Sequence, residues 1–438
     1  GQMIAVDLAE GRLYHDRELK DFLAARQPFG EWVKNIIQID SLIETAHPPD
    51  PEFNSEELRR RQLTSGWSME DLEMILHPMV EDGKEPTGSM GDDTPVAVLS
   101  EKYRGLHHFF RQNFSQITNP PIDSLRERRV MSIKTRLGNL GNILDEAAEQ
   151  CDLMQLDSPV LLNAEFAAMR TYLGDTSIDV DCTYEPGTES DDSALREALA
   201  RIQKESEDAI RGGCAHVVLS DKNIGPTRAP IPMILATGAV HIHLVRQHLR
   251  TFTSLNVRCG ECLDVHYFAV LVGVGATTVN AYLAEESIVE RHRRGLFGDL
   301  ALEECLSRYK TAVGDGLLKI MSKMGISVIS SYRGGYTFEA VGLSRALVAE
   351  FFPGMPSRIS GIGLAGIEHQ VVQRHAAAFN ADTVPLPVGG YYRSRRDGEL
   401  HAFEGQQIHL LQSAVATDSF ATYKHYSSAA GKMAPIHL

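Results

Sequence analysis

The feature that most constrains the fold is the alternation of amphipathic helical stretches with short apolar stretches between residues 190 and 352. Leu195, Leu199 and Ile202 recur at the spacing of one helix face, and a pair of glycines ends that stretch. Residues 215–219 then form an uncharged, mostly apolar run that is typical of a buried strand. One helix-strand unit is therefore predicted here.

The same order recurs further along the chain. A helix is predicted from Leu302 to Met324, Gly325 ends it, and residues 326–330 are predicted as a strand. Another helix is predicted over residues 339–351. Such alternation predicts a parallel sheet, either a barrel or a doubly wound sheet, with functional groups at the carboxyl ends of the strands. We favour an α/β fold with a (β/α)8 barrel-like central domain.

An N-terminal α+β connector region is expected before that domain. Residues 3–7 resemble a strand, a turn follows at Glu10-Gly11, and residues 16–25 are predicted as a short helix. Prolines at 48, 49 and 51 interrupt the chain. A charged helix is predicted from Ser55 to Leu76, with Ser68–Asp71 as a cap and His77-Pro78 as its end.

These patterns divide the 438 residues into three expected parts. Residues 1–80 form a connector and helical leader, residues 81–390 form the central α/β domain, and residues 391–438 form a hairpin and helix that lead onward.

The charge balance argues against nucleic acid as a partner. The chain has 43 Lys and Arg against 58 Asp and Glu, a formal charge of −15, whereas binding to phosphate backbones depends on an excess of cations. A membrane is also excluded as a partner, because the longest nearly uncharged run, residues 267–279, is shorter than the ~18–20 apolar residues of a membrane-spanning helix.

Targeting signals and cysteines point to the cytoplasm. The first seven residues have neither the basic region nor the apolar core of a secretory signal. The six cysteines are scattered along the chain, which is typical of reduced thiols and not of a disulfide framework.

Cys259 and Cys262 form a CxxC motif, and no second pair is present to complete a structural zinc site. The alternatives are a redox or metal role and two thiols at a turn after a strand. His241, His243 and His248 could likewise gather around a metal, but they lie in an apolar helical segment where packed or solvated histidines are more common.

Two glycine-rich runs could bind phosphate groups. Residues 361–366 match GxGxxG, but this run is expected to follow a loop, and a dinucleotide site requires a preceding strand. Residues 273–278 could bind a phosphate through backbone N–H groups ahead of a following helix, although the lysine of a P-loop is missing. A stand-alone α/β-barrel enzyme that binds a phosphate or flavin at the Gly273 loop is therefore an alternative function.

The run Tyr391–Arg396 interleaves aromatic and basic residues, a pattern that can bind single-stranded nucleic acid. The stronger interpretation is a β-hairpin, because Asp397-Gly398 is a hairpin turn signal and residues 399–403 alternate as a return strand.

Two polar runs are the most unusual features. Residues 88–95 place Asp92 and Asp93 on a glycine-rich turn, where they could bind a cation, act as a base, cap a helix or pair with arginines. Residues 110–123 hold amides and hydroxyls between aromatic residues and end in a rigid Pro-Pro turn. These groups suit a polar channel or pocket floor, since no activated nucleophile is visible.

These two runs, together with residues 329–334, resemble the central domain of the large (alpha) subunit of bacterial NADPH-dependent glutamate synthase. Residues 1–7 and 16–20 resemble the connector that follows the glutaminase domain of that family. The resemblance covers nearly the whole chain, and it also implies a barrel-like α/β unit that holds no flavin.

The resemblance implies an oxidoreductase and glutamine amidotransferase that makes L-glutamate from L-glutamine and 2-oxoglutarate. In this family a glutaminase domain releases ammonia, which passes through a tunnel to a domain that holds FMN and a 3Fe-4S cluster, where 2-iminoglutarate is formed and reduced. A small (beta) subunit with FAD and 4Fe-4S clusters supplies electrons from NADPH. The implied partners are these two domains, the small subunit and further copies in an oligomer.

The chain begins at Gly1 and ends at Leu438, so the glutaminase cysteine and the FMN site are expected to lie outside it. The segment alone is therefore expected to be inactive, with no catalytic, cofactor-binding or metal-binding residue of its own. The resemblance implies that five residues line the ammonia tunnel, namely Ser89, Met90, Gln116, Thr118 and Asn119. Asp92 and Asp93 are expected to fix the loop, because a carboxylate that faced the passage would protonate and trap ammonia.

Overall fold

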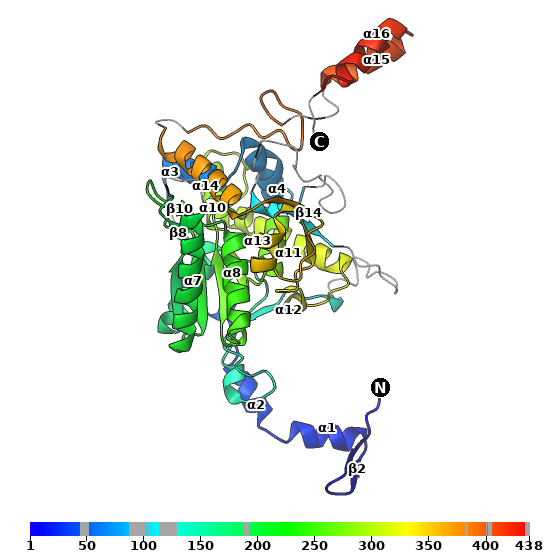
Figure 1. Ribbon diagram of the computed structural model, residues 1–438. Coiled ribbons are helices and arrows are strands. Elements are labelled where there is room, and N and C mark those ends of the chain that lie inside the picture. Colours follow the sequence, from blue (N-terminus) through cyan, green and yellow to red (C-terminus); the bar gives the residue numbers. More distant parts are fainter. Residues whose placement is uncertain are drawn as a thin grey trace.

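The computed structural model shows a main body from which both terminal regions project (Figure 1). The projecting elements are β1 (Ala5–Asp7), β2 (Arg12–Tyr14) and α1 (Asp16–Ala24) at one end, and α15 (Gly405–Ala416) and α16 (Phe420–Ala430) at the other. β1 and β2 pair as an antiparallel hairpin, with the predicted turn at Glu10-Gly11 between them; the second strand was not predicted. The structure describes residues 1–43, 52–86, 102, 105–113, 129–187, 192–381, 384–399, 401 and 405–433.

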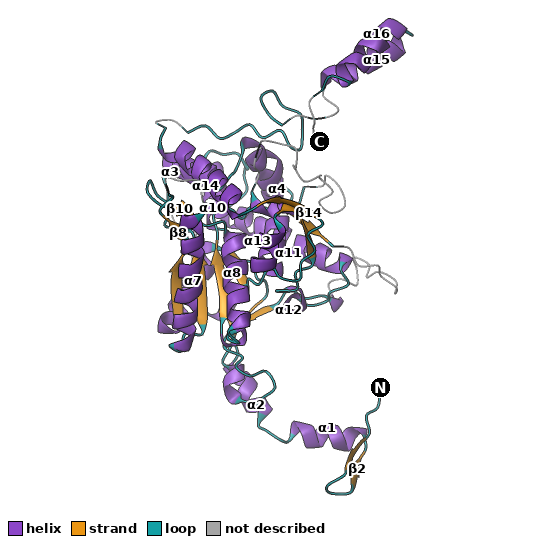
Figure 2. Ribbon diagram, in the orientation of Figure 1, coloured by secondary structure: helices purple, strands orange, loops and turns teal. Residues whose placement is uncertain are grey.

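A parallel sheet of four strands forms the centre of the body, in the order β12-β11-β9-β7. A helix follows each strand, so the helix-strand alternation predicted from the sequence is confirmed. In Figure 2 helices α7 and α8 lie in front of the orange strands of this sheet. In chain order the elements are β7 (Ser177–Asp181), α7 (Ser193–Arg211), β9 (His216–Ser220), α8 (Met233–Arg246), β11 (Ser254–Arg258), α9 (Val265–Gly273), β12 (Thr278–Asn280) and α10 (Tyr282–Arg293).

Both faces of the sheet are buried, as the alternation of side chains along β9 shows. Val217 and Leu219 belong to the main core, whereas Val218 belongs to a second core with Phe166 and Met169 of α6 (Asn163–Leu173). Successive residues of a strand point to opposite faces, so these cores lie on the two sides of the sheet. The continuous apolar run in this strand reflects burial on both faces.

Among the described residues, the four strands of this sheet do not pair into a closed ring. The edge of β12 pairs with an earlier segment: the Val279 N–H donates to the Pro159 carbonyl at 2.8 Å, and the Leu161 N–H donates to the Val279 carbonyl at 2.9 Å. In a regular barrel the next strand along the chain would occupy this edge. Within the described residues the pairing therefore gives a mixed α/β fold with a parallel sheet, and a closed eight-stranded barrel is not confirmed.

Smaller sheets surround the central one. β13 pairs in parallel with β14 and antiparallel with β4, β6 lies between β3 and β5, and β8 pairs antiparallel with β10. These strands are β3 (Ile37–Gln38), β4 (Phe110–Gln112), β5 (Thr135–Leu137), β6 (Met154–Leu156), β8 (Thr183–Tyr184), β10 (Ala229–Pro230), β13 (Phe338–Leu343) and β14 (Ile359–Ile362).

Two predicted elements between residues 326 and 351 are wrong. The strand predicted over 326–330 is not formed, because Val328 makes only an isolated bridge and α12 (Ile329–Tyr332) begins at the next residue. The helix predicted over 339–351 is strand β13 followed by α13 (Arg345–Phe351). Ser344 separates them, since its hydroxyl caps α13 by accepting the Leu347 N–H at 3.2 Å.

The helix predicted over residues 55–76 is divided in the structure. α3 (Ser55–Thr64) ends before Gly66, which adopts a left-handed φ of 82°. Ser68 and Asp71 cap the second part as expected, with the Ser68 hydroxyl 2.6 Å from the Asp71 carboxylate. A π-helical turn (Asp71–Leu76) then runs directly into α4 (His77–Glu81), so the helix does not end at His77-Pro78, and Pro78 is the second residue of α4.

The remaining long helices complete the main body. α3 packs on α14 (Leu364–Phe379), and α4 packs on α11 (Leu302–Lys323), which ends at Gly325 as predicted. None of the helices in the described ranges is long and apolar enough to cross a membrane.

Candidate site at the carboxyl edge of the sheet

The carboxyl ends of the parallel strands bring Asp221, the Cys259–Cys262 turn and Asn280 to one edge. The Gly260 N–H donates to both Asp221 oxygens, at 3.1 and 2.8 Å. A Cβ atom on Gly260 would lie 2.9 Å from the Tyr282 hydroxyl and 3.1 Å from the Ser65 hydroxyl. Only glycine fits this position, so the small residue within the CxxC motif is required for packing.

The buried acids at this edge favour their protonated forms. Asp221 has no exposed surface, and burial raises its pKa to about 7, while the Gly260 N–H opposes that shift. Burial also raises the pKa of Glu285 to about 7, although this carboxylate accepts the Asn163 N–H at 2.7 Å. Two acids at this edge therefore change charge near neutral pH.

Glu261 joins three neighbouring elements. Its Oε2 atom accepts the Met233 N–H at 2.9 Å, at the start of α8, and the Tyr267 hydroxyl at 2.7 Å, in α9. Its Oε1 atom lies 3.9 Å from Nη2 of Arg374 in α14. Burial raises the pKa of Tyr267 well above its ordinary value, so the phenol keeps its proton and remains a donor. The arrangement fixes the loop between β11 and α9.

A cavity of about 350 Å³ opens beside this loop. It lies between the segment after α3, the loop that leads into α9, and the segment that precedes α15. Its wall combines aromatic rings with carboxylates and imidazoles, a mixture of apolar surface and a few polar groups that is typical of ligand sites. The lining includes Trp67, Asp71, Lys102, His107, His108, Glu261, Asp264, Tyr267, Tyr391 and Tyr392.

One wall of the cavity is held by Glu70. This carboxylate, with no exposed surface, accepts the backbone N–H groups of Gly390, Tyr391, Tyr392 and Arg393 at 2.8, 2.6, 3.1 and 3.1 Å. Successive N–H groups that converge on one anion form a nest, and here the anion belongs to the protein itself.

The hairpin predicted for residues 391–403 is not formed within the described residues, because the N–H groups that it would pair bind Glu70. The turn also lies one residue earlier than predicted, since Gly398 donates to the Arg395 carbonyl at 3.0 Å and Asp397 has a φ of 63°. The predicted return strand lies partly outside the described residues.

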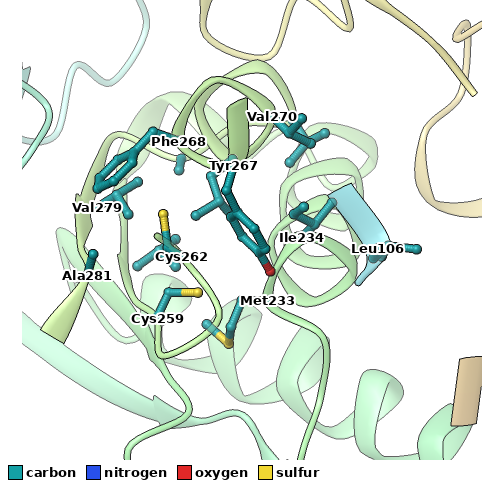
Figure 3. Packing of buried hydrophobic residues seen from close by; sticks show 14 of the residues in the cluster. Leu106, Met233, Ile234, Cys259, Cys262, Tyr267, Phe268, Val270, Val279 and Ala281 are labelled. Carbon is teal, nitrogen blue, oxygen red and sulfur yellow. The ribbon is translucent and has the colours of Figure 1, made fainter. Parts of the chain in front are cut away.

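Cys259 and Cys262 lie at a turn after a strand, among apolar side chains that include Met233, Phe268 and Val279 (Figure 3). Both are fully buried, and burial raises the pKa of each thiol well above its ordinary value. A protonated, enclosed thiol is a poor nucleophile and metal ligand. Among the described residues, no group of three His, Cys, Asp or Glu is arranged to hold a metal ion.

The three candidate histidines do not converge. His241 is buried, and its Nδ1 atom accepts the Arg250 Nε–H at 3.0 Å. His243 lies 2.7 Å from the Glu207 carboxylate, and His248 follows α8 on the surface. Burial and the Arg250 charge lower the pKa of His241 to about 3, so it stays neutral.

The Gly273 loop does not form the predicted phosphate site. It is buried and leads into strand β12, so no helix N-terminus follows it. A Cβ atom on Gly273 would lie 2.4 Å from the Phe338 ring, and one on Gly275 would lie 2.3 Å from the His241 ring. These glycines are therefore required for close packing, and the alternative function based on this loop loses its site.

The local context of the GxGxxG run differs from the prediction. It spans the end of β14 and the start of α14, so a strand precedes it where a loop was expected. A Cβ atom on Gly361 would lie 2.0 Å from the Gly342 carbonyl of the neighbouring strand. Contact between two backbones explains this glycine without a ligand.

The residues predicted to line the tunnel, Ser89, Met90, Gln116, Thr118 and Asn119, lie outside the described residues, as do Asp92 and Asp93. Lys102 and Gln112 lie near the ends of the two loops that carry these residues, and the structure describes both. Lys102 lines the 350 Å³ cavity, and the Gln112 amide lies 3.1 Å from Nδ1 of His266, the residue beside Tyr267. Lys102 and Gln112 therefore both lie near the start of α9.

Sequence reasoning missed Asp221, Glu261 and Glu70 as organising residues. The position of Asp221 two residues after the predicted strand 215–219 is a signal that could have identified it. Glu261 is visible only as part of the CxxC motif. For Glu70 the one signal is the remote Gly389-Gly390 pair, and both of these glycines have left-handed φ values.

Comparison with known proteins identifies related chains. A family model described as glutamate synthase central domain matches residues 60–344. The chain is 64% identical, over its whole length, to 29% of the glutamate synthase (NADPH) large chain of Azospirillum brasilense. It is 38% identical to the corresponding chain of Bacillus subtilis, with 98% of this chain and 28% of that chain covered. It is 36% identical to ferredoxin-dependent glutamate synthase 2, chloroplastic, of Arabidopsis thaliana, with 97% and 27% covered.

Among solved structures, a flavocytochrome b2 mutant aligns over 75% of this chain and 95% of its own, with 10% identity and a TM-score of 0.34. This level of similarity supports no conclusion. The curated relatives are more than three times longer than the segment they share with this chain. The family model alone covers more than half of the 438 residues, and the chain belongs to the glutamate synthase central domain family.

Proposed function

We propose that this chain is the central, non-catalytic domain of a glutamate synthase large subunit, and that it links the glutaminase and FMN sites and helps form the ammonia tunnel. The family match over residues 60–344 carries the proposal. The parent enzyme would make L-glutamate from L-glutamine and 2-oxoglutarate with reducing equivalents. The names of the relatives, which are glutamate synthase large chains, support this activity.

The positions of the two loop ends support the proposed tunnel. Lys102, at the end of the loop that carries Ser89 and Met90, lines the cavity at the sheet edge. Gln112, which precedes the loop that carries Thr118, contacts His266 at the start of α9. These loop ends are ten residues apart in the chain, and both lie close to the start of α9, which is compatible with a passage there.

The acids of this region are compatible with a passage for ammonia. Glu261 uses Oε2 for the Met233 N–H and the Tyr267 hydroxyl, and Asp264 accepts the Tyr267 N–H at 2.8 Å. Both carboxylates are thus engaged by donors within the protein. These acids are therefore proposed to fix the loop.

Further parts of the proposal follow from the family resemblance. The parent chain would hold FMN and a 3Fe-4S cluster in its synthase domain, and a small subunit with FAD, 4Fe-4S clusters and NADPH would be its partner in a cytoplasmic oligomer. The divisions 1–80, 81–390 and 391–438 are proposed as the connector, the central domain and the lead-in to the FMN domain. The four consecutive strand-helix units are proposed as the described part of a barrel-like unit.

The test is the coupling of the two half-reactions in the full-length enzyme with its small subunit. Thr118→Val removes a hydroxyl from the proposed passage, and Thr171→Val, on the exposed face of α6, is the control. We expect the first variant to hydrolyse more glutamine than the glutamate it forms and to release ammonia. Strict one-to-one coupling in Thr118→Val would contradict the tunnel assignment.

A further inference from the structure

A second polar cavity, of about 200 Å³, lies between α3 and α10 on a different part of the main body. Three arginines line it, together with the amide of Gln62. Two of them are Arg59 from α3 and Arg291 from α10, and the third, Arg294, pairs with Glu290. Arg291 is only 8% exposed and Gln62 only 3% exposed. The cavity is thus lined by charge that is largely removed from water.

The two arginines lack carboxylate partners among the described residues. Arg59 Nη1 lies 3.8 Å from the Met69 sulfur, and Arg291 Nη2 lies 3.5 Å from Nδ1 of His77. The Nε atom of Arg291 is buried and has no hydrogen-bond partner in the described structure. A buried charged donor without a partner is costly, unless a ligand satisfies it.

The acids at this cavity are already paired with other cations. Glu73 lies 3.1 Å from Arg395, and Glu290 lies 3.3 Å from Arg294. Burial lowers the pKa of Arg291, and the Arg294 charge adds to this shift. Once these ion pairs are set aside, Arg59 and Arg291 carry two positive charges that no acid of the described cavity lining balances. A dianion would balance both charges.

The amide of Gln62 distinguishes between possible anions. Its Nε2 donates to the Ser287 hydroxyl at 2.8 Å, and that hydroxyl in turn donates to the Leu283 carbonyl at 2.7 Å, so the orientation of the amide is fixed. The Gln62 Oε1 atom is consequently an acceptor, and it is buried without a described partner. An anion that satisfies both the arginines and this oxygen must itself carry an O–H donor.

We propose that this cavity is a binding site for hydrogen phosphate, held by Arg59 and Arg291, with its P–OH group donating to Gln62. Free phosphate near neutral pH carries such a group, whereas sulfate and the dianion of a phosphate monoester do not. The volume admits one small oxyanion with water and excludes a nucleotide. The site is separate from the proposed tunnel and does not depend on that function.

The experiment is titration calorimetry of the full-length protein at pH 7.5, at constant ionic strength in chloride. The probes are inorganic phosphate, sulfate and ribose 5-phosphate. We expect phosphate to bind at least tenfold more tightly than either other anion. Arg291→Gln should weaken phosphate binding at least tenfold, and Arg211→Gln, an exposed residue of α7, should leave it unchanged.

A second variant guards against loss of folding. Arg59 is partly exposed, so Arg59→Gln should fold even if Arg291→Gln does not, and it should also weaken phosphate binding. Equal affinities for phosphate and sulfate would overturn the assignment to hydrogen phosphate. Phosphate binding that survives in Arg59→Gln, or no binding by the wild-type protein, would overturn the site itself.

Discussion

The carboxylate of Glu70 accepts the backbone N–H of Gly390 at 2.8 Å, although 320 residues separate the two along the chain. Three further N–H groups bind the same carboxylate. Residues 387–399 therefore lie against the segment around Glu70, which precedes the π-helical turn and α4. There they form one wall of the 350 Å³ cavity.

Glu70→Ala should lower the free energy of unfolding by about 3 kcal/mol, because it leaves several buried N–H donors without an acceptor and each costs about 1–3 kcal/mol. Urea denaturation measures the loss, and limited proteolysis should then cut within residues 387–399. Glu73→Ala is the matched control. Its ion pair with Arg395 is exposed, and its loss should cost less than about 1 kcal/mol. Equal losses in both variants would contradict the role of Glu70.

The stability of the protein should depend on pH through Asp221. Because the folded-state pKa is raised to about 7 from 3.8, the folded protein holds a proton that the unfolded chain releases. The stabilisation that this proton gives the folded protein is present in full below about pH 4, and it is lost as the pH rises to about 7. As the pH rises from about 4 to about 7, the free energy of unfolding of Asp221→Asn should therefore increase relative to that of the wild type, by at most about 1.4 kcal/mol per pH unit.

Urea denaturation at several pH values measures that difference. Asp179→Asn changes an exposed acid in the neighbouring strand and should follow the wild type at every pH. An Asp221→Asn curve parallel to that of the wild type from pH 4 to 7 would show that the aspartate is ionised throughout.

Gly275→Ala should destabilise the protein by about 3 kcal/mol or more. The new methyl group would lie 2.3 Å from the His241 ring, and the φ of 126° is strained for any other residue. Gly295→Ala separates the two causes, because Gly295 also has a positive φ, of 73°, but open space around it. That control should lose only about 1 kcal/mol. Thermal unfolding of both variants provides the comparison.

The cysteines should differ in reactivity toward iodoacetamide. Cys151 and Cys214 are partly exposed and should be alkylated in the native protein, whereas Cys259 and Cys262 should react only after denaturation. Mass spectrometry of peptides after timed labelling measures each site. Early labelling of Cys259 or Cys262 would show that the loop after β11 opens to solvent.

The sequence predicted local structure where a pattern was long. The helix that ends at Gly212-Gly213, strand β9 and α11 are as expected, because each has several turns or an uninterrupted apolar run. Residues 339–351 were ambiguous, since Ala340 and Leu343 have the spacing of a helix, whereas the buried positions of the strand alternate at Phe338, Ala340 and Gly342. Ser344 sets the boundary between strand β13 and helix α13, because its hydroxyl caps the first turn of the helix. The helix therefore covers about half of the predicted range.

The strand order could not be predicted. Pairing of Val160 with Val279 joins segments whose separation leaves no local pattern in the sequence. The candidate site was predicted only as a place, the carboxyl ends of the strands. Two of its acids have raised pKa values because other segments of the chain bury them. The close approach of Gly260 to Tyr282 shows how tightly those segments pack at this edge. The predicted tunnel residues lie outside the described structure, so their roles stay predictions.

The long separation between Glu70 and Gly390 also has a consequence for synthesis. A ribosome adds about 5–20 residues per second, so the 320 residues between them take about 16–64 s to emerge. During that time the future cavity wall has not been made, and α3 also lacks its packing partner α14. The helices around residues 55–81 can pack on α10 and α11 earlier, but the buried carboxylate of Glu70 lacks its N–H donors until residues 390–393 have been made.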